Sequence, residues 1–339
     1  MSRGHLGIMA CESGKPFAKK IIEQLTLILQ KEQSNQKVRF VPSKETRFVN
    51  SEIKTEILES IRGVDVYIIQ DIQNSTNGYS VDENLRALKT AIDAAWRSGA
   101  GHISVVIPAF PYARQDKSKS REGITAARVA QEIENYKATQ IMTLDVHNPA
   151  IAGFFRQARF EDLHASKNII DFVNQNIDLK NLVVLSPDAG GAPRAEHYAS
   201  KLKTKLGFIY KKRDYSRPNV VENSVLLGDV KGKDVLLVDD MIDGGGTVVS
   251  SVTMLKEKEE ANKIYFACSL PIFSGQCIEK MDELYKKGYL TGIIATDAIF
   301  HGENFAKEHT WFIEVSVAKY FARVIFNINH NLSITELLK

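Results

Sequence analysis

The sequence has no long apolar run, few cysteines and little net charge. No window is long enough for a membrane span, and residues 1–14 lack the apolar core of a signal peptide. The three cysteines, Cys11, Cys268 and Cys277, give neither a disulfide framework nor zinc-ligand spacing. A net charge of +3 is too small to indicate a nucleic-acid or membrane partner. The composition therefore predicts a cytoplasmic protein in which each cysteine is a small buried side chain.

The chain has 339 residues, enough for two domains, and its 44% hydrophobic and 25% charged content is ordinary for a globular protein. Strand and helix patterns alternate, which predicts an α/β fold with mostly parallel sheets. Helix patterns cover 16–31, 82–98, 125–136, 167–176 and 194–205, strand patterns cover 37–41, 64–70, 102–107, 141–146, 182–185, 208–211, 263–270 and 292–296, and a strand and helix follow each other within 234–258. A break near residue 160 divides these patterns into two sets without a sequence repeat.

The segment 235–247 combines a short buried strand, an acidic turn and a glycine loop. Four apolar residues, 235–238, precede the acidic residues Asp239, Asp240 and Asp243, and the loop then leads into an amphipathic helix. Backbone N–H groups at a helix N-terminus bind an anion, whereas carboxylates suit hydroxyls or a cation. The pattern predicts a ligand with a phosphate and a diol, such as a ribose 5-phosphate. A flexible turn with ordinary helix capping is the alternative, and the spacing matches neither a Walker A loop nor the dinucleotide fingerprint.

Ligands of parallel sheets gather at the carboxyl ends of the strands. The sequences that follow five predicted strands all carry polar, ionisable or glycine-rich groups, and they are 108–117, 145–147, 186–191, 211–213 and 239–247. One such strand end is ordinary, whereas five together predict an assembled site.

These stretches, in this order, resemble the ribose-phosphate pyrophosphokinase (PRPP synthase) family over about residues 40–339. The most specific pieces are Pro-Tyr-Ala-Arg-Gln-Asp-Lys at 111–117, Asp-x-His at 145–147, Ser-Pro-Asp-Ala-Gly-Gly at 186–191 and Phe-x-Asn-x-Glu at 48–52. The resemblance implies two tandem type I phosphoribosyltransferase-like domains, 1–163 on the ATP side and 164–339 with the ribose 5-phosphate loop, and it allows the C-terminal tail to return to the first domain. It also implies Mg²⁺-dependent transfer of the pyrophosphoryl group of ATP to the C1 hydroxyl of ribose 5-phosphate, which gives PRPP and AMP.

The resemblance further implies a role for individual residues. The ribose 5-phosphate residues are Asp239, Asp240, Asp243, Gly244, Gly245, Gly246 and Thr247. The family more often has Thr and a small residue where this chain has Gly244 and Gly245, so one hydroxyl donor is lost here. The implied metal ligands are His147 and Asp188, with Asp145 beside them as a ligand or as the residue that orients His147.

The ATP residues implied by the resemblance are Phe48, Asn50, Glu52, Arg114, Gln115, Asp116 and His147. Phe48, Asn50 and Glu52 resemble an adenine pocket that a neighbouring subunit supplies, although an ordinary hairpin with Phe48 in the core would also fit. The implied catalytic residues are Lys211 and Arg213, which lead into a polar loop, together with His147. A shared ATP site predicts a homo-oligomer, and the resemblance implies a hexamer built from dimers.

Two other functions remain open at this point. A catalytically silent relative that regulates active subunits would bind nucleotide or PRPP, but such a protein is expected to have damaged catalytic motifs. A phosphoribosyltransferase for a base would need only the glycine loop, which leaves the ATP-like motifs without a role.

Overall fold

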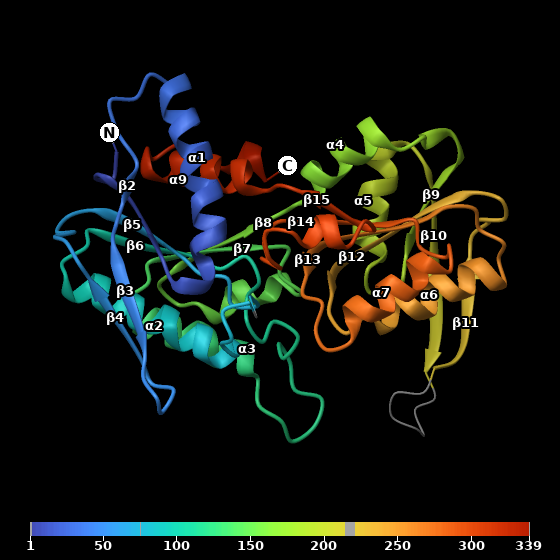
Figure 1. The fold of residues 1–339 in the computed structure, drawn as a ribbon, viewed down its shortest axis with the longest axis horizontal. Helices are drawn as coiled ribbons and strands as arrows, with labels where there is room; N and C mark the ends of the chain where they lie inside the picture. The colour runs from blue at the N-terminus through green and yellow to red at the C-terminus, as the bar shows by residue number, and fades with distance from the viewer. Residues whose placement is uncertain (1, 75, 214–220, 339) are drawn as a thin grey trace. The chain divides into compact units, whose positions relative to one another are not determined.

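The computed structural model describes residues 2–74, 76–213 and 221–338, except for the side chains of 211–213 and 221–223. The chain forms two compact units (Figure 1). Unit 1 consists of Met1–His164, Asp297–Gly302 and Ser316–Lys339, and unit 2 consists of Ala165–Thr296 and Glu303–Val315. Each unit is built around one sheet with helices on both faces, so the predicted α/β fold class is confirmed.

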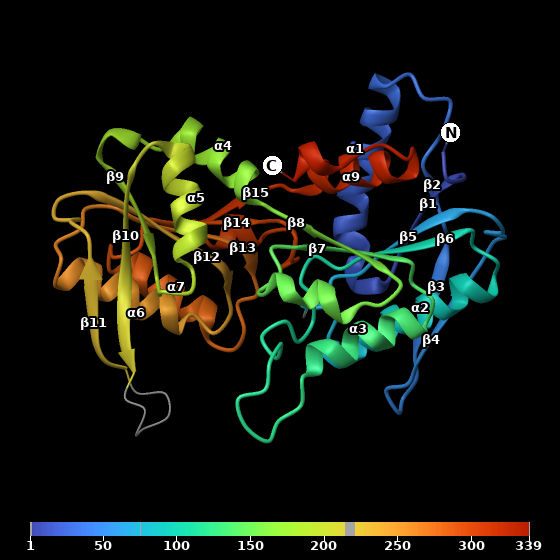
Figure 2. The ribbon, with the colours of Figure 1, turned by 180° about the vertical axis from the view of Figure 1, so that it is seen from behind.

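The sheet of unit 1 contains parallel strands only. Its order is β2 (Arg39–Phe40), β1 (Leu6–Ala10), β5 (Asp65–Ile69), β6 (His102–Val106), β7 (Gln140–Leu144) and β8 (Arg159–Leu163). Helices α1 (Lys15–Lys31) and α9 (Ala318–Asn329) cover one face, and α2 (Val81–Arg97) and α3 (Thr125–Asn135) cover the other (Figures 1 and 2). A separate antiparallel hairpin, β3 (Ser43–Arg47) and β4 (Ile53–Ile57), contacts α2.

The core of unit 1 follows the helical periodicity of the sequence. Leu85, Leu88, Ile92 and Ala95 recur on one face of α2, and all four are buried in the cluster between the helices and the sheet. The helix starts where local chemistry favours it, because Ser80 and Glu83 form a reciprocal capping box.

The sheet of unit 2 is parallel except for one edge strand. Its order is β11 (Val221–Leu227), β10 (Lys205–Arg213), β9 (Leu182–Ser186), β12 (Asp234–Ile242), β13 (Ile264–Pro271), β14 (Gly292–Thr296) and β15 (Phe312–Val315), with β10 and β11 antiparallel. Helices α4 (Ser166–Asn176) and α5 (Ala192–Leu202) lie on one face, and α6 (Gly246–Glu257) and α7 (Cys277–Lys286) lie on the other (Figures 1 and 2). The short elements are α8 (Phe305–Glu308), η1 (Glu12–Gly14), η2 (Pro149–Phe154), η3 (Leu179–Asn181) and η4 (Thr335–Leu337).

Some predicted boundaries are wrong. The sequence predicts an acidic turn after residue 238, whereas β12 continues to Ile242, so Asp239 and Asp240 lie in the strand. The sequence predicts a helix over 194–205, whereas α5 ends at Leu202 and β10 already begins at Lys205. The cause is Lys203, which adopts a left-handed conformation with φ 56° and ends the helix one residue after Leu202. Strand β10 therefore starts three residues before the predicted start at Phe208.

Two predictions from composition can be compared with the structure. Cys11, Cys268 and Cys277 are free and buried, as predicted. Among the described residues, no helix is long and apolar enough to cross a membrane.

Candidate functional site

Unit 2 brings three of the predicted strand ends together, because β10, β9 and β12 are neighbours in its sheet. β9 pairs in parallel with both other strands, so the carboxyl ends lie at the same edge. The turn after β9 also approaches β12, since a Cβ on Gly191 would lie 3.9 Å from the carbonyl oxygen of Val238. In unit 1, the neighbouring parallel strands β6 and β7 place their two ends side by side in the same way.

The end of β12 buries two adjacent carboxylates. Asp239 and Asp240 have side chains that are 20% and 8% exposed, and Nη1 of Arg194 in α5 lies 3.7 Å and 3.9 Å from one oxygen of each. Oδ1 of Asp239 accepts the N–H of Asp240 at 2.9 Å. Burial, with repulsion from Asp240, raises the pKa of Asp239 to about 7. One guanidinium thus faces two carboxylates, which leaves the pair able to bind a proton, a cation or hydroxyl groups.

The glycine loop 244–246 connects β12 to α6, and packing requires glycine at its middle position. Gly245 has a φ of +74°, and a Cβ there would lie 2.8 Å from Sγ of Cys277. A Cβ on Gly244 or Gly246 would meet no atom within 4 Å, so the loop is open at both residues. Helix α6 has Gly245 at its N-cap and no side-chain cap, so its first N–H groups can bind an anion.

The turn after β9 fixes one oxygen of Asp188. Oδ1 accepts the N–H of Gly191 at 2.9 Å, and the carbonyl oxygen of Asp188 accepts the hydroxyl of Ser186 at 2.6 Å. Among the described residues, no donor bonds to the second oxygen, Oδ2. The half-buried carboxylate is therefore held in place with one oxygen available to a ligand.

Lys211 and Arg213 belong to the end of β10, and the structure describes their backbone but not their side chains. Lys211 pairs with Ser224 and Arg213 with Val221, and the register shifts between Lys212 and Arg213. β10 continues past its last partner in β9, the pair Phe208 and Ser186. The backbone thus extends beyond the strand end. Strand alternation predicts that both cations share one face, but their side chains and the loop 214–220 lie outside the described residues.

In unit 1, the segment after β6 carries Arg114, Gln115 and Asp116. Arg114 and Gln115 are exposed, and Oε1 of Gln115 accepts the hydroxyl of Thr125 at 2.6 Å, which ties the segment to the start of α3. Oδ2 of Asp116 accepts a hydrogen bond from Asn148, which follows β7. Burial raises the pKa of Asp116, but the hydrogen bond from Asn148 and nearby cationic groups outweigh it, so the net shift is downward.

Asp145 and His147 follow β7 directly. Asp145 is buried with a φ of +43°, and its Oδ1 lies 3.0 Å from Nδ1 of His164, the last residue in the first segment of unit 1. His147 is exposed. The carboxylate of Asp145 therefore has an imidazole partner, His164, that the Asp-x-His spacing does not predict.

Phe48, Asn50 and Glu52 form the tip of the hairpin β3–β4. The N–H of Phe48 donates to the carbonyl of Glu52 at 2.8 Å, and Oδ1 of Asn50 accepts the N–H of Glu52 at 3.2 Å. Phe48 is 47% exposed and Val49 is fully exposed, so Phe48 is not a core residue of this chain. The hairpin alternative is thus correct for the backbone and wrong for the burial of Phe48.

Within the described part of the chain, no group of three or more His, Cys, Asp or Glu side chains is arranged to hold a metal ion. Mg²⁺ at nucleotide sites is usually bound by one or two carboxylates together with phosphate oxygens. The available Oδ2 of Asp188 is a donor of this kind, so the residues fit an ion that binds together with a nucleotide.

Three side chains of the site come from helices or turns far from the motifs they support. Arg194 reaches the carboxylates of β12 from α5, His164 contacts Asp145, and Nζ of Lys280 in α7 donates to the carbonyl of Gly244 at 2.9 Å. Arg194 belongs to the family pattern that follows 186–191, although its contact with the carboxylates of β12 is not predicted. Nothing in the sequence marks His164 or Lys280 as neighbours of these motifs.

The chain is similar to known proteins over nearly its whole length. Residues 6–136 match the N-terminal domain of ribose phosphate pyrophosphokinase, and residues 157–302 match the phosphoribosyl transferase domain. Ribose-phosphate pyrophosphokinase 1 of Listeria monocytogenes is 35% identical over 98% of this chain and 97% of the relative. The ribose-phosphate pyrophosphokinase of Chlorobaculum tepidum is 40% identical over 97% of this chain and 94% of the relative. The crystal structure of phosphoribosylpyrophosphate synthetase from Mycobacterium smegmatis matches with a TM-score of 0.83 and 28% identity, over 96% of this chain and 99% of that one.

The raised pKa of Asp239 predicts that Asp239→Asn stabilises the fold, and does so more at about pH 8 than at about pH 5. In the folded chain the carboxyl of Asp239 stays protonated up to about pH 7, whereas in the unfolded chain it loses its proton at about pH 3.9. The stability linked to this proton is therefore fully present below the unfolded pKa and is lost as the pH rises through the folded value. The measurement is the thermal unfolding midpoint of both proteins at each pH.

Asp171→Asn is the matched control, because Asp171 is an exposed carboxylate on α4 of the same unit. A gain from Asp239→Asn that is equal at both pH values, or larger at the lower one, would contradict the assignment.

Proposed function

The chain belongs to the ribose-phosphate pyrophosphokinase family, and from this membership we propose how its own residues divide the formation of PRPP and AMP from ATP and ribose 5-phosphate. The reaction joins the β,γ-pyrophosphoryl group of ATP to the C1 hydroxyl of the sugar. Such a reaction needs a site for the sugar phosphate, a site for the nucleotide, and positive charge where the phosphoryl group is transferred.

The sugar phosphate is assigned to the end of β12. The supporting observation is that buried carboxylates there are followed directly by an open glycine loop. Asp239, Asp240 and Asp243 would accept hydrogen bonds from the ribose hydroxyls. The N–H groups of Gly244–Thr247, at the uncapped start of α6, would bind the 5-phosphate. The carboxylates disfavour an anion, whereas the N–H groups of the loop favour one. Ribose 5-phosphate matches both, because it has hydroxyls at one end and a dianionic phosphate at the other.

The nucleotide is assigned to the exposed groups of unit 1. Arg114, Gln115 and Asp116 follow β6, and arginine can hold a phosphate bidentately or stack on adenine. Phe48, Asn50 and Glu52 would supply the adenine pocket of a neighbouring subunit. The support is their place at an exposed hairpin tip, where an aromatic ring is half-exposed. The enzyme would then be active only as an oligomer, and we propose a hexamer built from dimers.

Magnesium is assigned to His147 and Asp188, with Asp145 as a further ligand or as a residue that acts through its neighbours. When bound with ATP, the ion would neutralise phosphate charge. Asp188 fits this role because its turn fixes one oxygen and leaves the other available. The contact between Asp145 and His164 favours a supporting role for Asp145.

Lys211 and Arg213 are assigned to the transfer itself, with His147 as the third catalytic residue. Negative charge develops on the oxygens of the transferred group, so cations that approach it there lower the barrier. The support is the family motif and the backbone of β10, which extends beyond the end of β9. Intact cations at both positions favour an active enzyme over a silent regulatory subunit. We also propose that the enzyme works in the cytoplasm, since its three cysteines are free thiols.

The catalytic assignment predicts that Lys211→Ala and Arg213→Ala each lower kcat by about 100-fold or more, while the KM for ATP changes little. A contact made mainly in the transition state affects turnover rather than ground-state binding. Lys205→Ala, an exposed lysine at the start of the same strand, should behave like the parent. Turnover near the parent level in both test variants would rule out the assignment.

The metal and sugar assignments predict different defects. Asp188→Asn should raise the magnesium concentration needed for half-maximal rate, because an amide is a poorer Mg²⁺ ligand, although its oxygen can still accept the N–H of Gly191. Asp243→Asn should raise the KM for ribose 5-phosphate more than the KM for ATP. Steady-state kinetics with each substrate and the ion varied in turn measures both effects. An Asp243→Asn defect confined to ATP would show that the two ends of the site are exchanged.

A further inference from the structure

The first turns of α7 lie directly beneath the glycine loop. Cys277, Lys280 and Met281 are spaced i, i+3 and i+4, so they share one face of this helix. A Cβ on Gly245 would lie 2.8 Å from Sγ of Cys277 and 3.1 Å from Cε of Met281. The two buried side chains therefore form the floor on which the middle of the loop rests.

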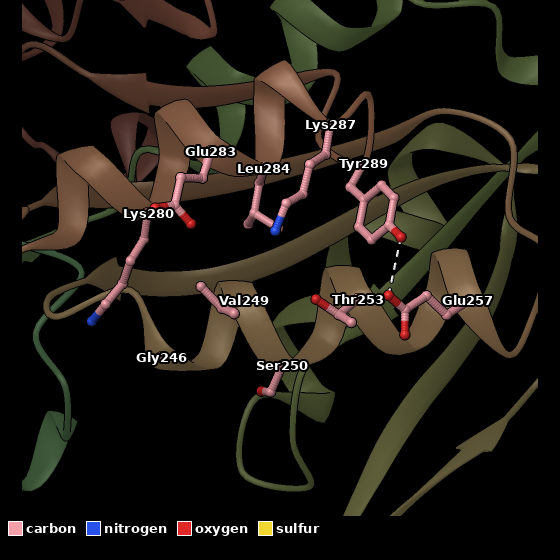
Figure 3. Close-up of a pocket in the computed structure, with 10 residues that line it drawn as sticks. All are labelled: Gly246, Val249, Ser250, Thr253, Glu257, Lys280, Glu283, Leu284, Lys287 and Tyr289. Carbon is pink, nitrogen blue, oxygen red and sulfur yellow. Dashed lines mark hydrogen bonds between the residues drawn. The ribbon is translucent and has the colours of Figure 1, made fainter.

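Lys280 bonds to the loop itself. Its Nζ donates to the carbonyl oxygen of Gly244 at 2.9 Å, and Figure 3 shows its side chain extending from α7 across the groove between α6 and α7 toward the start of α6 at Gly246. Within the described residues, no carboxylate lies within ion-pair distance of this ammonium, although Glu283 lines the same groove. A lysine ammonium has three donors, so two remain after the bond to Gly244.

The bond fixes the direction of one peptide group. In a trans peptide the carbonyl and the N–H point in opposite directions. The carbonyl of Gly244 is held toward Lys280, so the N–H of Gly245 is turned away from it. Gly244, on one side of this peptide, has no Cβ and has open space around it, so its own packing does not fix the direction of the carbonyl. Gly245, on the other side, packs against α7. Among the described residues, the side chain whose hydrogen bond to this carbonyl opposes rotation of the peptide is Lys280.

We propose that Lys280 is a positioning residue for ribose 5-phosphate: it holds the Gly244–Gly245 peptide so that the N–H of Gly245 donates to the 5-phosphate. This role rests on the proposed function of the loop. It gives a reason for three successive glycines to form a defined cradle, although glycine is the residue with the greatest backbone freedom. It also adds a positive charge next to a dianion, and among the described residues no carboxylate lies within ion-pair distance of that charge.

Lys287 provides a matched control. It lines the same groove, whose volume is about 380 Å³, and lies seven positions further along the chain (Figure 3). Among the described residues, it makes no side-chain hydrogen bond to the loop. Lys287→Met therefore removes the same charge from the same groove without releasing the peptide.

The test is the dissociation constant of ribose 5-phosphate, measured by calorimetry in the full-length protein, together with the KM for each substrate. Lys280→Met keeps the apolar stem and should weaken ribose 5-phosphate binding by about 10-fold, since a hydrogen bond from a charged donor is lost. The KM for ATP should change by less than about 2-fold, because ATP does not use this peptide. Lys280→Arg should restore binding, and Lys287→Met should match the parent.

Each other outcome has a definite meaning. Parent protein that fails to bind ribose 5-phosphate would refute the proposed function of the loop and this role with it. Parent protein that binds, with Lys280→Met unchanged, would refute the role of Lys280 alone. Equal losses in Lys280→Met and Lys287→Met would show a general charge effect, and a parallel loss for both substrates would show a structural defect. If Lys280→Met does not fold, the test uses Lys280→Arg. A folded Lys280→Arg variant that binds ribose 5-phosphate at least about 10-fold more weakly than the parent would overturn the proposed role of Lys280.

Discussion

The burial of two neighbouring carboxylates at the end of β12 is the constraint on which the structure of unit 2 depends. Asp239 and Asp240 lie in an interior strand, so their charges are removed from water and repel each other. Arg194 of α5 offsets part of that repulsion, which ties a helix on one face of the sheet to the strand end. Immediately afterwards the chain passes through Gly245, which tolerates no Cβ above Cys277 of α7 on the opposite face. Helices from both faces of the sheet thus contact the end of β12 and the glycine loop. The result is a strand end with carboxylates on one side and the N–H groups at the start of α6 on the other.

The sequence predicts those features that arise locally. The apolar run 235–238 and the residues after it indicate a buried strand, a turn and a helix, and β12 and α6 have this order, although β12 continues through Asp239 and Asp240 to Ile242. Features that depend on contacts between distant residues are not predictable in this way. The hairpin β3–β4 is polar and lacks a clear alternation, the end of α5 depends on one left-handed residue, and the partners Arg194 and Lys280 come from other helices. For the same reason, three adjacent glycines look equivalent in sequence, whereas the structure requires glycine at 245 and leaves space for a Cβ at 244 and 246.

The family explains why the chain contains two sheets with chemistry at their strand ends. Transfer of a pyrophosphoryl group requires two anionic substrates to approach each other, which is unfavourable unless fixed positive groups and an ion offset the charge. Unit 2 supplies the loop proposed for the sugar phosphate, and unit 1 supplies the exposed groups proposed for the nucleotide. The relatives from Listeria and Chlorobaculum match both parts, whereas a base-specific phosphoribosyltransferase would leave the motifs of unit 1 without a role.

The most direct test is the reaction itself. Purified protein should be incubated with magnesium, ATP and ribose 5-phosphate, and the nucleotide and sugar products should be quantified together. Formation of AMP and PRPP in equal amounts, dependent on both substrates and on magnesium, is the expected result. Tight nucleotide binding without AMP formation would identify a silent regulatory subunit. Consumption of PRPP that depends on an added base would identify a phosphoribosyltransferase, and either of these results would contradict the proposed division of roles.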